Sequence, residues 1–150
     1  MPQSLSMVIL HIVFSTKHRE PLIFKELRNE LNLYIATVCK TCNSIPIKIG
    51  CVSDHIHIAA SLPRIITVSK LLEEVKKSSS KWIKEKDERL QHFSWQDGYA
   101  VFSISQSHLD RLVNYIKNQE SHHRDKSFQQ ELRNHLNHYR IKYDERYVWD

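Results

Sequence analysis

Glycine is scarce in this chain, with only Gly50 and Gly98 among 150 residues. Loops that hold nucleotide phosphates need several closely spaced glycines, because their backbone N–H groups must approach the phosphate oxygens. Nucleotide-binding enzymes of the P-loop or Rossmann kind are therefore excluded, and we expect no nucleotide cofactor.

Long apolar runs are also missing. No stretch of the sequence approaches the roughly 18 consecutive apolar residues that a membrane-spanning helix requires. The first residues, Met1-Pro2-Gln3-Ser4, lack the basic start, apolar stretch and small-residue cleavage site of a signal peptide. These absences predict a cytoplasmic protein without a membrane partner.

Cysteine is limited to Cys39, Cys42 and Cys51, which fits a reducing compartment better than a disulfide framework. Cys39 and Cys42 have the CxxC spacing, but they close a predicted helix. A redox CxxC usually opens a helix, where the helix dipole lowers the thiol pKa. A structural zinc site would need further ligands, so incidental thiols are the favoured interpretation.

The remaining composition is that of a globular protein that can meet nucleic acid. Hydrophobic residues make up 41% of the chain and charged residues 26%, and both values are ordinary for a folded domain. A length of 150 residues suits one domain, here residues 1–150. The net charge of +5 and the pI of about 9.1 permit a nucleic-acid partner without requiring one.

Apolar periodicity predicts an alternation of strands and helices. The order is β-α-β-β-α-β followed by two helices, which is the ferredoxin-like (split β-α-β) pattern of the α+β class. We expect an antiparallel sheet with helices on one face, a second face left free for a ligand or partner, and C-terminal helices added. Strands are expected at 8–15, 46–52, 55–61 and 99–105, and helices at 24–39, around 71–83, at 107–119 and at 127–139.

Start signals support three of these helices. Thr67 or Ser69 can cap the second helix. The third and fourth begin with capping-box patterns, in which a hydroxyl side chain precedes an acid or amide by three residues. These pairs are Ser107 with Asp110 and Ser127 with Gln130.

Two histidines separated by one residue, His55 and His57, are the strongest candidate functional feature. They lie in an alternating stretch, and side chains at i and i+2 of a strand project from the same face. His55 and His57 therefore form an imidazole pair while Ile56 and Ile58 point into the core. Two imidazoles on a strand can supply two ligands to a divalent metal. The alternative is a pair of half-exposed histidines without a ligand.

A tyrosine and a glutamine on the expected third helix form a second candidate feature. Tyr115 and Gln119 lie one turn apart on a flank of the apolar stripe, so both side chains can reach one shared point. A tyrosine can act as a covalent nucleophile, and an amide oxygen is a plausible third ligand for a hard divalent metal. The alternative is a half-buried tyrosine beside a surface glutamine.

Together these residues resemble the single-tyrosine HUH transposases, the small transposases of hairpin-ended insertion sequences that move as single-stranded DNA. The histidine pair on a central strand, followed by Tyr115 and Gln119 on a late helix, carries the resemblance, which extends over nearly the whole chain. Its flanking segments are Leu10-His11-Ile12-Val13-Phe14-Ser15-Thr16-Lys17, Lys77-Ser78-Ser79-Ser80-Lys81-Trp82, Trp95-Gln96-Asp97-Gly98-Tyr99, His122-His123 and Tyr143-Asp144-Glu145-Arg146-Tyr147.

The resemblance implies a metal-dependent transposase and single-strand endonuclease. Tyr115 would attack the scissile phosphate and form a 5′-phosphotyrosine link. His55, His57 and Gln119 would bind Mg²⁺ or Mn²⁺. The partners implied are single-stranded DNA with hairpin ends and a second copy of the chain in a homodimer. The sequence does not decide whether the tyrosine acts in cis or in trans.

Further DNA contacts are expected on the second helix and before the fourth strand. The lysines of that helix lie largely opposite its apolar stripe and could neutralise phosphates; a solvated helix face is the alternative. Trp95 and Tyr99 could stack an unpaired base, or pack. The candidate DNA-binding residues are Lys76, Lys77, Lys81, Lys84, Trp95 and Tyr99.

Three alternatives concern other roles. His122-His123 and His135-x-x-His138 have metal-ligand spacings, although helical histidines of this kind usually lie on a hydrated surface. A domesticated relative, or a replication or mobilisation nickase, would keep the same chemistry on genomic hairpins. A non-catalytic single-strand binder would use the ferredoxin-like sheet as RNA-recognition domains do, but it would not need Tyr115 and Gln119.

Overall fold

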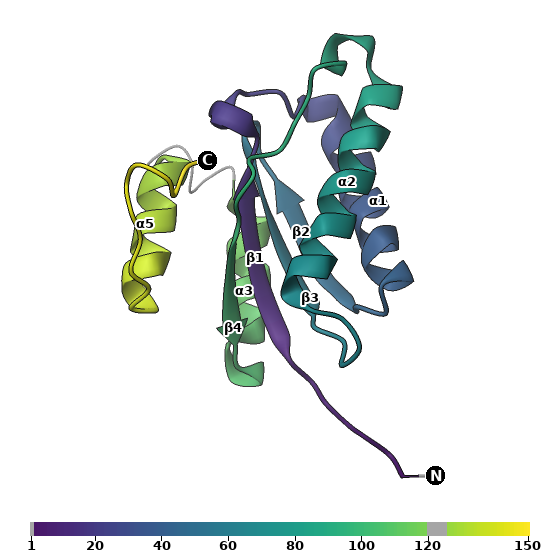
Figure 1. Cartoon of the computed structure of the whole chain (residues 1–150), viewed down its shortest axis with the longest axis vertical. Helices are drawn as coiled ribbons and strands as arrows, with labels where there is room; N and C mark the ends of the chain where they lie inside the picture. The colour runs from purple at the N-terminus through teal and green to yellow at the C-terminus, as the bar shows by residue number, and fades with distance from the viewer. Residues whose placement is uncertain (1, 120–125) are drawn as a thin grey trace.

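The computed structural model of the chain describes residues 2–119 and 126–150. Its centre is a four-stranded sheet with the order β2-β3-β1-β4, in which all neighbouring strands run antiparallel. This is the ferredoxin-like arrangement that the element order predicts (Figure 1). The strands are β1 (Ile9–Ser15), β2 (Pro46–Cys51), β3 (His55–Ser61) and β4 (Ala100–Ile104).

Two helices, α1 (Arg28–Thr41) and α2 (Val68–Lys86), cover one face of the sheet (Figure 1). The main core lies beneath them because alternate residues of β1 and β3 point to this side, among them Ile12, Ile56 and Ile58, each with no exposed surface. Neither these helices nor any other within the described ranges is long and apolar enough to cross a membrane.

The other face of the sheet is covered as well, which corrects the expectation of a free face. Helix α3 (Leu109–Lys117) packs Leu112 and Ile116 against Ala59 of β3. Helix α5 (Phe128–His138) lies on the same side (Figure 1) and buries its apolar stripe against β1 and β4. That second cluster consists of Val13, Phe102, Phe128, Leu132 and Leu136. Any site on this face is therefore enclosed between sheet and helices.

Helix start signals are confirmed in part. The hydroxyls of Thr67 and Ser127 accept hydrogen bonds from backbone N–H groups three residues later, at 3.0 Å and 3.2 Å. The capping box expected at Ser107 is wrong, because a 3₁₀ turn, Gln106–His108, precedes α3 and the Ser107 hydroxyl pairs with that of Ser105. A similar turn, Lys25–Leu27, precedes α1, which therefore begins later than expected.

Gly50 allows α3 to lie close to β2. A β-carbon at this position would be 2.8 Å from Ile116 Cγ2 and 3.0 Å from the Ile116 carbonyl oxygen. A separation of 2.8 Å is shorter than real β-carbon contacts. Any residue other than glycine at position 50 would therefore require a shift of α3. Because Ile116 follows Tyr115, this contact also fixes the depth of the tyrosine.

Candidate metal centre and tyrosine

The histidine pair lies at the centre of the sheet, on the face covered by α3 and α5. His55 and His57 share this face because β3 alternates, with Ile56 and Ile58 directed to the opposite core. Both histidines have no exposed surface, and their ring centroids are 5.2 Å apart. The expectation of a side-by-side pair is therefore met, whereas the alternative of half-exposed histidines is wrong.

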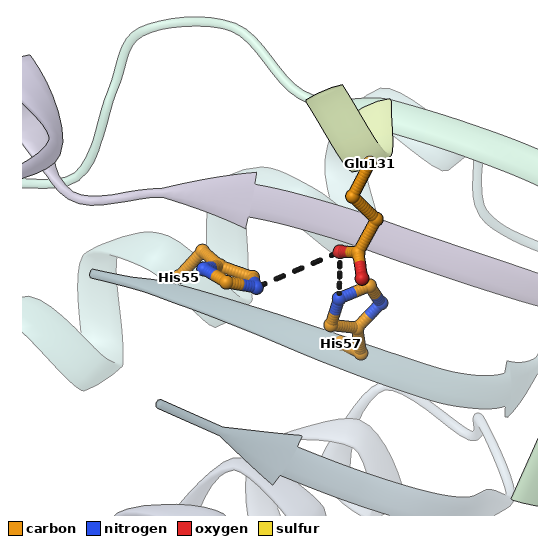
Figure 2. Close-up of side chains that lie close together, drawn as sticks. All are labelled: His55, His57 and Glu131. Carbon is orange, nitrogen blue, oxygen red and sulfur yellow. Dashed lines mark hydrogen bonds and ion pairs between the residues drawn. The ribbon is translucent and has the colours of Figure 1, made fainter. Parts of the chain in front are cut away.

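Glu131 of α5 joins the two histidines. Its Oε1 atom lies 2.8 Å from His57 Nε2 and 3.6 Å from His55 Nε2, as Figure 2 shows. The carboxylate is only 4% exposed, and one ligand atom from each side chain falls within 4.8 Å of the others. Two imidazole nitrogens and a carboxylate oxygen form a donor set that suits a divalent metal. Within the described ranges this is the only group of at least three such side chains.

The outer nitrogen of each imidazole is held by a further side chain. His55 Nδ1 lies 2.7 Å from Asp54 Oδ1, and His57 Nδ1 lies 2.8 Å from His11 Nε2. These contacts aim both Nε2 atoms at Glu131, because a ring nitrogen fixed on one side orients the other. Asp54 belongs to the β2–β3 connection and His11 to the neighbouring strand β1. The pair is thus oriented before any ligand arrives.

Burial keeps His57 and His11 neutral. Desolvation lowers the pKa of His57 to about 4, although the hydrogen bond and charge of Glu131 act in the opposite direction. The pKa of His11 is lowered by burial and by the neighbouring His57 and His135. A neutral imidazole is the form that ligates a metal, so His57 is in its ligand form at neutral pH.

Tyr115 reaches the same carboxylate from α3. Its hydroxyl donates a hydrogen bond to Glu131 Oε2, whereas the other carboxylate oxygen, Oε1, contacts the histidines. The Tyr115 ring centroid is 5.7 Å from that of His57, nearly edge-on. Burial and the negative charge of Glu131 raise the pKa of Tyr115 above its ordinary value. The phenol is therefore protonated in this state, with its proton directed to Glu131.

Gln119 lies beside the tyrosine at the end of α3. Its side chain is 3% exposed, and its Nε2 atom is 3.3 Å from the Tyr115 carbonyl oxygen. A hydrogen bond from the Gln119 side chain weakly opposes the rise in the pKa of Tyr115. The predicted association of Tyr115 with Gln119 is thus present, while metal ligation by Gln119 stays a prediction.

The sequence did not predict Glu131 or His11 as site residues, nor the packing of His135. The signal lay in the last helix, where Glu131 and His135 fall on the apolar face with Phe128, Leu132 and Leu136. A carboxylate on such a face is rarely buried without a partner, so its position could have marked it. His135 packs its ring 5.3 Å from His11 and 5.7 Å from Tyr115. His122 and His123, also considered for a metal, lie outside the described residues.

The predicted DNA-binding lysines lie on α2, on the opposite face of the sheet from the histidine pair. Lys76 donates hydrogen bonds to the carbonyl oxygens of Gln96, Asp97 and Gly98, at 2.8, 3.2 and 2.5 Å. Lys76 therefore holds the segment 96–98 against α2. Lys77 pairs with Glu74 at 3.4 Å, Lys81 is exposed and Lys84 is half-buried.

The two aromatic candidates differ in exposure. Trp95 is 5% exposed, stands edge-on to Phe14 and Phe93, and donates its N–H to the Ser79 hydroxyl at 2.9 Å. These contacts favour packing for Trp95 over base stacking. Tyr99 is 42% exposed, with the Lys76 ammonium 5.5 Å from its ring centroid. Base stacking by Tyr99 stays a prediction.

Comparison with known proteins agrees with this geometry. The family model "Transposase IS200 like" matches residues 4–119. Two transposases for insertion sequence element IS200, from Salmonella typhimurium and Salmonella typhi, are each 27% identical over 114 residues, which is 73% of this chain and 74% of theirs.

Solved structures share the fold. A putative transposase from Deinococcus radiodurans R1 superimposes with a TM-score of 0.61 at 16% identity, over 79% of this chain and 98% of its own. A REP-associated tyrosine transposase bound to a REP hairpin gives 0.60 at 17% identity, over 82% and 72%. The family match covers most of the chain, and its fold is the fold described here. This chain is a member of the IS200-like transposase family.

Proposed function

We propose that this protein is a transposase that cleaves and rejoins single-stranded DNA at the hairpin ends of an insertion sequence, through a covalent link to Tyr115. One observation carries the proposal: Tyr115 and the histidine pair converge on the two oxygens of Glu131. A nucleophile beside a metal-ligand set is the arrangement that phosphoryl transfer to a side chain requires.

His55 and His57 would hold the divalent metal, Mg²⁺ or Mn²⁺, with Glu131 or Gln119 supplying an oxygen. The buried Glu131 carboxylate beside the two imidazole nitrogens fits such an ion, because it brings negative charge to a site that excludes water. When bound, the metal would act as a Lewis acid on the scissile phosphate.

The reaction can be followed through the chain's own residues. Tyr115 Oη attacks phosphorus while the Glu131 carboxylate accepts the phenolic proton along the existing hydrogen bond. The bond from phosphorus to the 3′ oxygen breaks, and that oxygen leaves with the electron pair and takes a proton to become a 3′-hydroxyl. The DNA remains attached as a 5′-phosphotyrosine, so a later 3′-hydroxyl can reverse the step without ATP.

The proposed partners are inferred from the family and from one solved structure of similar fold. The REP-associated transposase of similar fold is bound to a DNA hairpin, which supports hairpin-ended single strands as the substrate here. We also propose a homodimer in the cytoplasm. Tyr115 lies beside His57 of its own chain, which supports cleavage in cis in this state.

A cleavage assay tests the proposal. Purified protein is mixed with labelled single-stranded DNA from the flanks of the gene, with and without Mg²⁺ or Mn²⁺. We expect a metal-dependent protein–DNA adduct that survives denaturation and is absent from Tyr115→Phe and His55→Ala. Tyr147→Phe is the matched control, since Tyr147 is exposed and outside the site. Hairpin binding without any adduct would contradict the catalytic proposal.

A further inference from the structure

A cavity of about 640 Å³ lies between α3, α5 and the end of β4, with Tyr115 in its wall. This volume is within the range of roughly 300–1,000 Å³ that is typical of small-ligand sites. It adjoins the candidate metal centre through His11, which contacts His57. An occupant of this cavity would therefore lie beside Tyr115.

The polar groups around the cavity favour an anionic or hydrogen-bonding occupant. The described residues that line the cavity include no carboxylate. They do include the basic side chains of Arg111, His108 and His138. The exposed Arg111 forms no hydrogen bond or ion pair within the described part of the chain.

The apolar part of the wall favours a flat ring. Ile104 and Leu112 contribute aliphatic surface, and Tyr139 lines the cavity with a ring that already stacks on Phe102 at 4.8 Å between centroids. Single-stranded DNA offers a base that can stack or pack in such a place together with a phosphate for a nearby cation. A duplex cannot enter, because its bases are paired and stacked.

We propose that this cavity binds one unpaired deoxynucleotide adjacent to the phosphate that Tyr115 attacks. The base lies against Ile104, Leu112 and Tyr139, and Arg111 contacts the backbone phosphate. The inference rests on the proposed function, since it assigns a position of the same DNA strand. It makes one base next to the cleaved bond a determinant of binding.

The test uses Tyr115→Phe protein, which keeps the aromatic ring but cannot form the adduct. Flank-derived single strands carrying an abasic site at successive positions are titrated by fluorescence anisotropy. We expect one position beside the cleaved phosphate to weaken binding roughly 5- to 150-fold, the range for loss of a single stacked base. A flat abasic scan would overturn the proposal.

Two cavity variants with matched controls locate the effect. Ser105→Trp places a large ring at the cavity wall, whereas Ser107→Trp makes the same change on the adjacent turn outside the wall. Ser105→Trp should abolish the position-specific loss, and Ser107→Trp should keep it. Arg111→Gln should weaken binding and reduce the slope of log affinity against log salt by about one, unlike Arg64→Gln, which lies outside the cavity wall.

The adduct assay separates this inference from the proposed function. If wild-type protein forms the adduct but Ser105→Trp behaves like Ser107→Trp, the nucleotide cavity is wrong and the transposase chemistry stands. If wild-type protein forms no adduct while the abasic position still matters and depends on Ser105, the cavity stands and the catalytic proposal fails. Thermal melting of each variant confirms that it is folded.

Discussion

Glu131 is the residue on which the candidate site depends most. Its two oxygens face different partners, one the histidine pair and the other the tyrosine hydroxyl. A single carboxylate can therefore hold the two imidazole nitrogens in place and accept the proton of the proposed nucleophile, Tyr115. Gln119, the third ligand expected from sequence, lies two residues beyond the end of α3, and its side chain contacts the Tyr115 carbonyl oxygen without a carboxylate's charge.

Glu131→Gln separates these roles, because the amide keeps the size but loses the charge. We expect the rate of adduct formation at saturating metal to fall about 10²–10⁴-fold, the contribution of a general base. Single-turnover kinetics measure this rate. Glu85→Gln, an exposed position on α2, is the matched control. An unchanged rate in Glu131→Gln would show that the proton leaves by another route.

The depressed pKa of His57 predicts a pH dependence of stability. The folded-state pKa of about 4 lies below the ordinary value of 6.5, so between these values the unfolded chain binds a proton that the folded chain does not. The free energy of unfolding of metal-free protein should therefore fall as pH drops from about 6.5 to 4, by about 3 kcal/mol from this group.

Urea denaturation at a series of pH values checks the dependence on His57. The comparison is with His57→Gln, in which the slope of stability against pH should be shallower because the titrating group is gone. The slope is the informative quantity, since the variant also changes the packing. Equal slopes in the two proteins would contradict a buried neutral His57.

At the scale of elements, the close contact between β2 and α3 sets the position of Tyr115, the proposed nucleophile. Gly50 allows Ile116 to approach the strand, and Tyr115 is its neighbour on the helix. The site therefore combines a strand with two helices that reach it from different parts of the sequence. Each helix is held by its own small apolar cluster.

Gly50→Ala should push α3 away from the sheet. A β-carbon 2.8 Å from Ile116 Cγ2 forces a shift that costs about 1–3 kcal/mol, and it should slow adduct formation by moving Tyr115. Chemical denaturation and the cleavage assay measure the two effects. Gly98→Ala is the control, since the atom nearest to an added β-carbon there is the Asp150 carbonyl oxygen, at 3.0 Å, and not an atom of α3. Full activity in Gly50→Ala would show that the helix depth is not critical.

Local patterns predicted the elements well because each pattern acts within one strand or helix. Alternation in β3 placed His55 and His57 on one face, and helical spacing joined Tyr115 to Gln119. The contact of Glu131 with the histidines depends on how α5 docks on the sheet, across a sequence separation that no local period encodes. The burial of Trp95 was open for the same reason, since the Phe14 and Phe93 contacts are tertiary.

At the scale of the whole molecule, one chain brings together every residue of the candidate site. Sheet, α3 and α5 contribute His55, His57, Tyr115 and Glu131 without a second copy. The proposed homodimer is therefore not needed to complete the site in this state. An exchange of tyrosine helices between copies would produce a different arrangement, which mixing can detect.

Mixing two inactive variants tests this point. Tyr115→Phe lacks the nucleophile and His57→Ala lacks a metal ligand, so a shared site could arise only if one copy supplies the tyrosine to the other. For cleavage in cis we expect the mixture to form no more adduct than either variant alone. Recovery of adduct in the mixture would establish transfer of the tyrosine between copies.

The central position of β3 affects which parts of the protein open locally. His55 and His57 lie on a strand paired on both sides, to β1 and to β2, whereas Glu131 and Tyr115 lie on peripheral helices. Amide protons of such a central strand exchange only with large openings, while a peripheral helix held by a few apolar contacts opens locally at lower cost. Partial opening of α5 would therefore uncover the buried centre while the two imidazoles keep their spacing.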